Sequence, residues 1–143
     1  MPVLEDVHYK KVIEIGKKAI QYLNNNEIEP FFQTVEEAWN MFPEPRENWN
    51  QAYNYTKMVF NHAVDLKNKE ESHKWMNRLI GVNNALHLAD DEIQFFLGVY
   101  FYETGEKEKA LEKWIEVEKS AGLRYFESER GQKYFDYFMS SKT

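Results

Sequence analysis

The hydrophobic residues of this chain recur every three or four positions over most of its length, which is the period of amphipathic helices. The first apolar stripe predicts a helix from about Val7 to Leu23, with Asp6 as its N-cap. A second stripe follows Glu29-Pro30, where proline is tolerated in the first turn of a helix, and ends at Pro43. Residues 24–26 are all asparagine, so we expect the first helix to stop there and the chain to turn.

A second helix pair is predicted in the middle of the chain. Its first helix would run from about Trp49 to Leu66, with Asn48 and Gln51 three residues apart as a capping box. The return helix would run from Glu70 to Val82. With only four Pro and six Gly in the chain, long segments contain no helix breaker, and the sequence predicts an all-α fold.

The stretch 91–124 contains the most specific pattern. Leu97-Gly98 is followed three residues later by Phe101, and Ala110 precedes Trp114 by four residues. Two antiparallel helices can approach closely only where the facing side chain is absent or very small. Gly98 and Ala110 would therefore be the contact points, and the larger side chains would fill the space between the helices.

This pattern resembles the tetratricopeptide repeat, whose signature is W-x2-L-G-x2-Y followed by A-x3-F and a closing proline. Gln94 stands at the position of the leading tryptophan, and Gly122 stands at that of the closing proline. The resemblance implies an all-α, tetratricopeptide-like array of antiparallel helix pairs. We expect about seven helices in a single domain over residues 1–143, ending in a capping helix from Ser128 to about Met139.

The resemblance also implies where a partner would bind, because such arrays use exposed positions on the first helix of each pair. The partner-binding candidates at these positions are Lys57, Asn61, Glu92, Phe95, Val99, Tyr102 and Glu103. They predict an acidic, aromatic groove that accepts an apolar side chain beside a lysine or arginine of the partner. As alternatives, Phe95 and Tyr102 would pack against a neighbouring helix, and the aromatic residues of the last helix would form either the cap or a second binding surface.

Charge and composition narrow the classes of partner and compartment. The net charge of −6 argues against nucleic-acid binding, which needs a basic face, and favours a basic protein or peptide. The chain has no cysteine, which fits a reducing compartment. No apolar run approaches the length of a membrane span, so we expect no membrane insertion and a cytoplasmic location.

Candidate chemical groups are sparse. Glu70 and His73 form one Glu-x-x-His pair, whereas a di-iron bundle needs two such pairs and two further glutamates. No Gly-x-Ser-x-Gly or phosphate-binding loop is present. We therefore expect no cofactor, no metal and no catalysis, with a helical metal-dependent enzyme as the alternative.

Two roles fit a small, acidic, non-catalytic binding protein. The first is an immunity or antitoxin protein that masks a basic toxin domain, since opposite charge steers and speeds association. The alternative is a cytosolic chaperone or adaptor that binds apolar peptide segments.

The repeat assignment makes a prediction about stability. Trp114→Ala should cost on the order of 3–5 kcal/mol, as for other buried aromatic truncations. Ala110→Leu should cost roughly 1–3 kcal/mol because it overpacks the helix pair. Thermal melts that show no effect of either substitution would contradict the assignment.

Overall fold

A computed structural model describes residues 3–142, and these residues form seven α-helices and two short 3-10 turns, with no strand among them. The α-helices are α1 (Asp6–Asn24), α2 (Ile28–Asn40), α3 (Asn50–Asp65), α4 (Lys69–Ala85), α5 (Asp91–Glu103), α6 (Lys107–Ala121) and α7 (Glu129–Ser141). The 3-10 turns are η1 (Arg46–Asn48) and η2 (Arg124–Glu127). The predicted all-α fold of about seven helices is confirmed.

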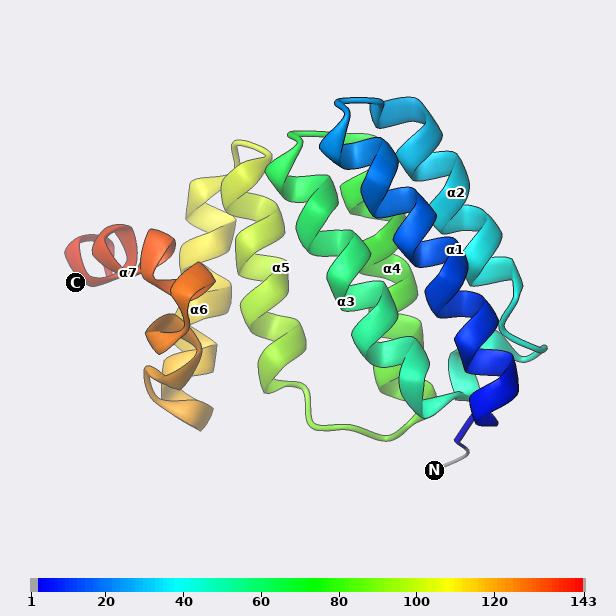
Figure 1. Ribbon diagram of the computed structural model, residues 1–143. Coiled ribbons are helices and arrows are strands. Elements are labelled where there is room, and N and C mark those ends of the chain that lie inside the picture. Colours follow the sequence, from blue (N-terminus) through cyan, green and yellow to red (C-terminus); the bar gives the residue numbers. More distant parts are fainter. Residues whose placement is uncertain (1–2, 143) are drawn as a thin grey trace.

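The helices pack as three antiparallel pairs, α1 with α2, α3 with α4, and α5 with α6. Figure 1 shows these pairs side by side in chain order, with η2 and α7 at the end of the row beside α5 and α6. Their buried hydrophobic side chains form one continuous core that runs through all three pairs. Each amphipathic helix thereby hides its apolar stripe, as the periodicity of the sequence requires.

The α5/α6 pair shows the close approach that its small residues predict. A β-carbon built on Gly98 would lie 2.1 Å from Nε1 of Trp114, so the indole occupies the space that any other residue would fill. The same Nε1 donates a hydrogen bond of 3.1 Å to the backbone carbonyl of Phe95. Ala110 and Trp114 are both fully buried. The predicted roles of Gly98, Ala110 and Trp114 in packing are thus confirmed.

A polar clamp with aromatic neighbours joins α2 to α4. The guanidinium of Arg78 donates two hydrogen bonds, of 2.9 and 2.8 Å, to the carboxylate of Glu36. It also lies over the ring of Trp75, 4.6 Å from the centroid. Burial alone would raise the pKa of Glu36, but the hydrogen bonds from Arg78 and Lys74 lower it overall. This bidentate pair fixes the second helices of neighbouring pairs against each other.

Helix capping was only partly predicted. Ser128 accepts a hydrogen bond from the backbone N–H of Gly131, as expected. Asp6 is instead the first residue of α1 and caps nothing. The capping box of Asn48 and Gln51 is wrong, because the Gln51 amide pairs with both the backbone N–H and C=O of Leu4, at 3.0 Å each. That pairing satisfies both backbone groups of Leu4 at once.

The C-terminal segment, residues 124–141, packs its aromatic rings inward. The rings of Phe126 and Phe138 stack with centroids 4.8 Å apart, and both are fully buried with Tyr134. The hydroxyl of the half-buried Tyr137 donates a hydrogen bond of 3.1 Å to the carbonyl of Lys107. These aromatic residues were predicted to form either a cap or a second binding surface, and their packing supports a cap over the end of the row of helix pairs.

The Gly98 contact gives a test with a matched control. Gly98→Ala should lower the free energy of unfolding by roughly 1–3 kcal/mol, because the methyl group of the alanine would collide with the Trp114 ring. Gly16→Ala on α1 meets no atom within 4 Å and should instead raise it by roughly 0.5–1 kcal/mol, because alanine is the better helix former. Urea unfolding measures both, and equal effects of the two substitutions would contradict the packing described for Gly98.

Candidate functional site

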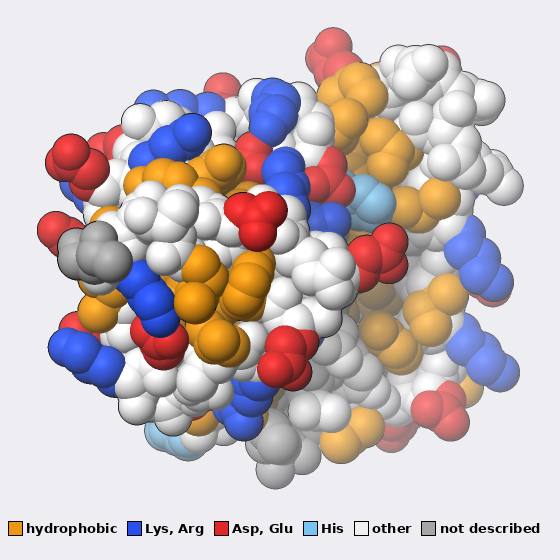
Figure 2. Space-filling model, turned by 90° about the vertical axis from the view of Figure 1, so that its left-hand side faces the viewer, with side chains coloured by type: hydrophobic (Ala, Val, Ile, Leu, Met, Phe, Trp, Pro, Cys, Tyr) orange, Lys and Arg blue, Asp and Glu red, His pale blue; other side chains and the backbone are white. Residues whose placement is uncertain are grey.

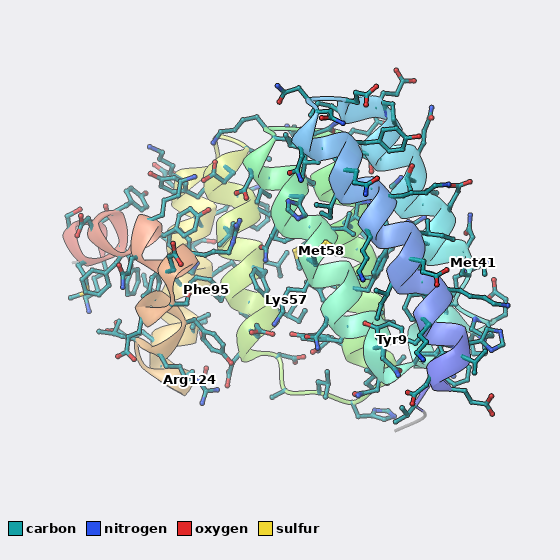
Figure 3. The ribbon with its side chains drawn as sticks, viewed as in Figure 1. Tyr9, Met41, Lys57, Met58, Phe95 and Arg124 are labelled. Carbon is teal, nitrogen blue, oxygen red and sulfur yellow. The ribbon has the colours of Figure 1, made fainter. Side chains whose placement is uncertain are left out.

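The predicted site residues come from α3 and α5, which together with α1 form one face of the molecule, called here the first-helix face. Lys57 and Asn61 come from α3, and Glu92 comes from α5. The Lys57 ammonium lies 3.3 Å from the Glu92 carboxylate, which also accepts a hydrogen bond of 2.5 Å from the hydroxyl of Tyr53. Figure 3 shows Lys57 between α3 and α5. Lys57 and Tyr53 of α3 therefore bind Glu92 across the two helices.

Phe95 and Val99 are not exposed on this face, contrary to expectation. Both are buried, with 4% and 2% of their surface accessible. The ring of Phe95 stacks on Tyr125 at 5.7 Å and meets Phe126 edge to face at 5.2 Å. Figure 3 shows Phe95 directed toward the C-terminal segment. Phe95 therefore packs against a neighbouring element of the chain, which was the alternative prediction for this residue.

Tyr102 and Glu103 are covered by α7. Tyr102 packs edge to face on Tyr134, with ring centroids 5.3 Å apart. The Glu103 side chain is only 4% exposed, and its carboxylate pairs with Lys67 and with Lys133, the latter at 2.7 Å, while the Tyr134 hydroxyl donates to it at 3.1 Å. Burial alone would raise the pKa of Glu103, but the hydrogen bonds from the two lysines lower it overall. This carboxylate is already neutralised within the chain.

The C-terminal segment also reaches α3. The Arg130 guanidinium binds the Asp65 carboxylate through two hydrogen bonds, of 3.0 and 2.8 Å, and donates a third of 3.4 Å to the carbonyl of Asn61. The part of the first-helix face that α5 forms is thus occupied by residues of the same chain. The structure brings the predicted residues together, but mostly as an internal contact between α3, α5 and α7.

The open part of the first-helix face is a groove between α1 and α3, with a volume of about 610 Å³. Its walls are apolar apart from a few polar side chains. The lining residues are Tyr9, Val12, Ile13, Gly16, Lys17, Ile20 and Gln21 from α1, and Asn54, Tyr55, Met58 and His62 from α3. Tyr9 and Met58 lie between the two helices in Figure 3, and hydrophobic side chains gather around a histidine on the more distant part of the surface in Figure 2.

Gly16 helps to form this α1–α3 groove. No atom lies within 4 Å of a β-carbon built at this position, so a side chain here would extend into open space. Ile13 beside it is 41% exposed, which is unusual for a large aliphatic side chain in this structure. A groove of this size with exposed apolar walls is typical of a binding site.

None of the groove residues was among the sequence-based candidates. The signal was present as a second apolar row on α1, since Tyr9, Ile13, Gly16 and Ile20 follow one another at four, three and four residues. Only one apolar stripe was predicted for this helix. A helix with two apolar rows has more hydrophobic surface than a single neighbouring helix can cover.

His62 is the titratable imidazole in the groove wall. Its ring meets Phe31 edge to face at 5.5 Å. Burial lowers its pKa, an effect that Asp65 opposes and Arg130 reinforces. At pH 7 the neutral form of the His62 imidazole is therefore favoured, and this uncharged ring extends the apolar wall of the groove.

Three further observations bear on the class of protein. Within residues 3–142, no three His, Asp or Glu side chains lie close enough together to hold a metal ion. No helix in the same range is both long and apolar enough to cross a membrane. Comparison of the chain with known protein families, curated proteins and solved structures gives no match.

The buried carboxylate of Glu103 predicts a pH dependence. Its pKa is lower in the folded protein than its ordinary value of 4.5, so it adds stability above that pH and loses it as the pH falls through the folded-state pKa. Glu103→Gln should be less stable than the wild type at pH 7, and the two should converge in strong acid. Urea unfolding between pH 7 and about pH 3 measures this. Glu116→Gln, which removes an exposed surface pair with Lys119, should leave the pH dependence unchanged.

Proposed function

We propose that the protein is a non-catalytic protein-binding module that takes an apolar segment of a partner into the α1–α3 groove. The observation that carries this proposal is the open apolar groove beside Gly16. Among residues 3–142, the surface of α5 that the sequence predicts as the site is covered by η2 and α7, whereas the groove between α1 and α3 is open.

The shape and chemistry of the groove favour a peptide over a small substrate. It follows α1 from Tyr9 to Gln21, which is about 18 Å at the helical rise of 1.5 Å per residue. Two helices bound it, so it is open along its length rather than closed around a ligand. A site for a small polar substrate needs several converging polar groups, whereas here apolar side chains predominate. An apolar row of a partner chain matches this surface.

The resemblance to tetratricopeptide repeats supports the same class of function. The three helix pairs and the Gly98–Trp114 contact are what a tetratricopeptide-like array would have, and such arrays are interaction scaffolds. We therefore prefer an adaptor or chaperone that binds apolar segments to an immunity protein that masks a basic toxin. The immunity interpretation is motivated by the small size and net negative charge of the chain, and the two carboxylates of the predicted groove, those of Glu92 and Glu103, are paired with lysines of this chain.

A groove-filling variant tests the proposal. Peptides that bind the wild type would be selected from a random library, and their affinities measured for Gly16→Leu and Gly81→Leu. The first substitution places a leucine in the groove, where nothing lies within 4 Å of the new β-carbon. The second makes the same change on α4, away from the groove, where the new β-carbon meets only the flexible Glu47 side chain at 3.7 Å.

We expect Gly16→Leu to weaken binding at least about tenfold and Gly81→Leu to leave it unchanged, because one lost apolar contact site is worth roughly 1–3 kcal/mol. Amide shifts in the NMR spectrum should change for residues 9–21 and 54–62 when peptide is added. Selected peptides that bind Gly16→Leu as tightly as the wild type would show that the groove is not the binding site.

A further inference from the structure

The charge of the lysines on α1 bears on the kind of partner that the groove binds. Lys10, Lys11, Lys17 and Lys18 all lie on this helix, and all four are exposed. Within residues 3–142, none of them has a carboxylate within 4.0 Å. This is unusual in an acidic protein, since most of its other basic side chains are paired.

Pairing elsewhere in the chain makes the contrast clear. The chain has 18 lysine and arginine residues and a net charge of −6. Those near the predicted site, such as Lys57, Lys67 and Lys133, bind the acidic residues of α5. Arg130 binds Asp65 in the same region. α1 carries its four lysines against two carboxylates, those of Asp6 and Glu14, so net positive charge gathers on the helix that forms one wall of the open groove.

Two of the four lysines belong to the edge of the groove. Lys10, Ile13 and Lys17 are spaced by three and four residues, so they share one side of α1, and Glu14 lies next to them, four residues after Lys10 and three before Lys17. Ile13 and Lys17 line the groove directly. The opposite wall, formed by α3, presents Asn54, Met58 and the neutral His62. The groove thus has an apolar floor with positive charge along one edge.

The backbone of an occupant must also be accommodated. Both walls are helices, whose backbone groups are already hydrogen-bonded within each helix. An extended peptide would bring its own N–H and C=O groups against apolar side chains, and each unsatisfied group costs free energy. A helical segment satisfies these groups internally, so it is the conformation that this groove accepts at the lowest cost.

We propose that the occupant is an acidic amphipathic helix of a partner protein, with its apolar stripe in the groove and carboxylates along the flank that faces Lys10 and Lys17. This inference rests on the proposed function and adds the class of partner to it. A length of about 12 residues, or three turns, matches the 18 Å from Tyr9 to Gln21. The partner's charge is opposite to that expected from the net charge of the chain, because the local charge at the groove differs from the total.

Designed peptides test the charge and the conformation separately. The first is a helical peptide of about 15 residues with leucine along one face and glutamate along one flank. The second carries lysine in place of each glutamate, and the third is the acidic peptide with a proline in its centre. Fluorescence anisotropy would give the dissociation constant of each for the wild type, at low and high salt.

The protein variants reverse the groove's charge with a matched control. Lys10→Glu combined with Lys17→Glu changes the edge of the groove. Lys69→Glu combined with Lys113→Glu makes the same change in net charge on α4 and α6, at lysines that also lack a carboxylate within 4.0 Å among the described residues. Circular dichroism melts would verify that both double variants are folded, since surface changes of this kind have small effects on stability.

We expect the wild type to bind the acidic peptide at least about tenfold more tightly than the basic one, and salt to reduce this preference. The variant with Lys10→Glu and Lys17→Glu should reverse the preference, and the control variant should keep it. The peptide with proline should bind at least about tenfold more weakly than the acidic peptide.

The outcomes separate failure of this inference from failure of the proposed function. If the basic peptide binds the wild type as well as the acidic one, and Gly16→Leu weakens both, the groove is a binding site but its partner is not acidic. If the peptide with proline binds as well as the acidic one, the helical conformation is wrong. If the peptides bind Gly16→Leu as tightly as the wild type, both proposals are overturned. If the acidic peptide does not bind at about 1 mM, the inference about the partner is overturned.

Discussion

The contact between Trp114 and Gly98 determines how the C-terminal half of the molecule is assembled. The indole fills the space that the glycine leaves, and its N–H binds the carbonyl of Phe95, so α5 and α6 are held at short distance. The same ring packs against Phe126 of η2 and Tyr134 of α7. One buried side chain thus connects the last helix pair with the segment that closes it, and the position of that segment follows from this contact.

Closure at this end explains the division of the first-helix face. Once η2 and α7 pack on Trp114, they cover Phe95 and Tyr102, and Arg130 extends the contact to Asp65 on α3. No element among residues 3–142 covers the corresponding surface between α1 and α3, where the groove lies. α3 is therefore a shared wall, in contact with the C-terminal segment on one side and with the groove on the other.

The sequence predicted the helices well because the periodicity of apolar residues is a local property of each helix. It also identified the contact of Gly98, Ala110 and Trp114, because small and large residues at matching positions of two consecutive helices can be recognised in the sequence. It failed where the outcome depends on the path of the chain. Phe95 and Val99 occupy the predicted positions on α5, but both are buried, and nothing local indicates that residues about 30 positions later pack on Phe95. Gln51 was likewise assigned to a cap because its partner, the backbone of Leu4, is 47 residues away. The groove was missed because the second apolar row of α1 is visible in the sequence, but the sequence does not show that no other helix packs on that row.

Gly16 shows that stability and binding make opposite demands at one position. In the middle of a helix a glycine leaves the unfolded chain more freedom than any other residue, so it weakens the fold at a site where its conformation does not require it. A sequence chosen for thermal robustness alone would carry a larger residue here and would lose the hollow in the surface of α1. Engineering this protein as a heat-stable scaffold and preserving its ability to recognise a partner are consequently competing aims at residue 16.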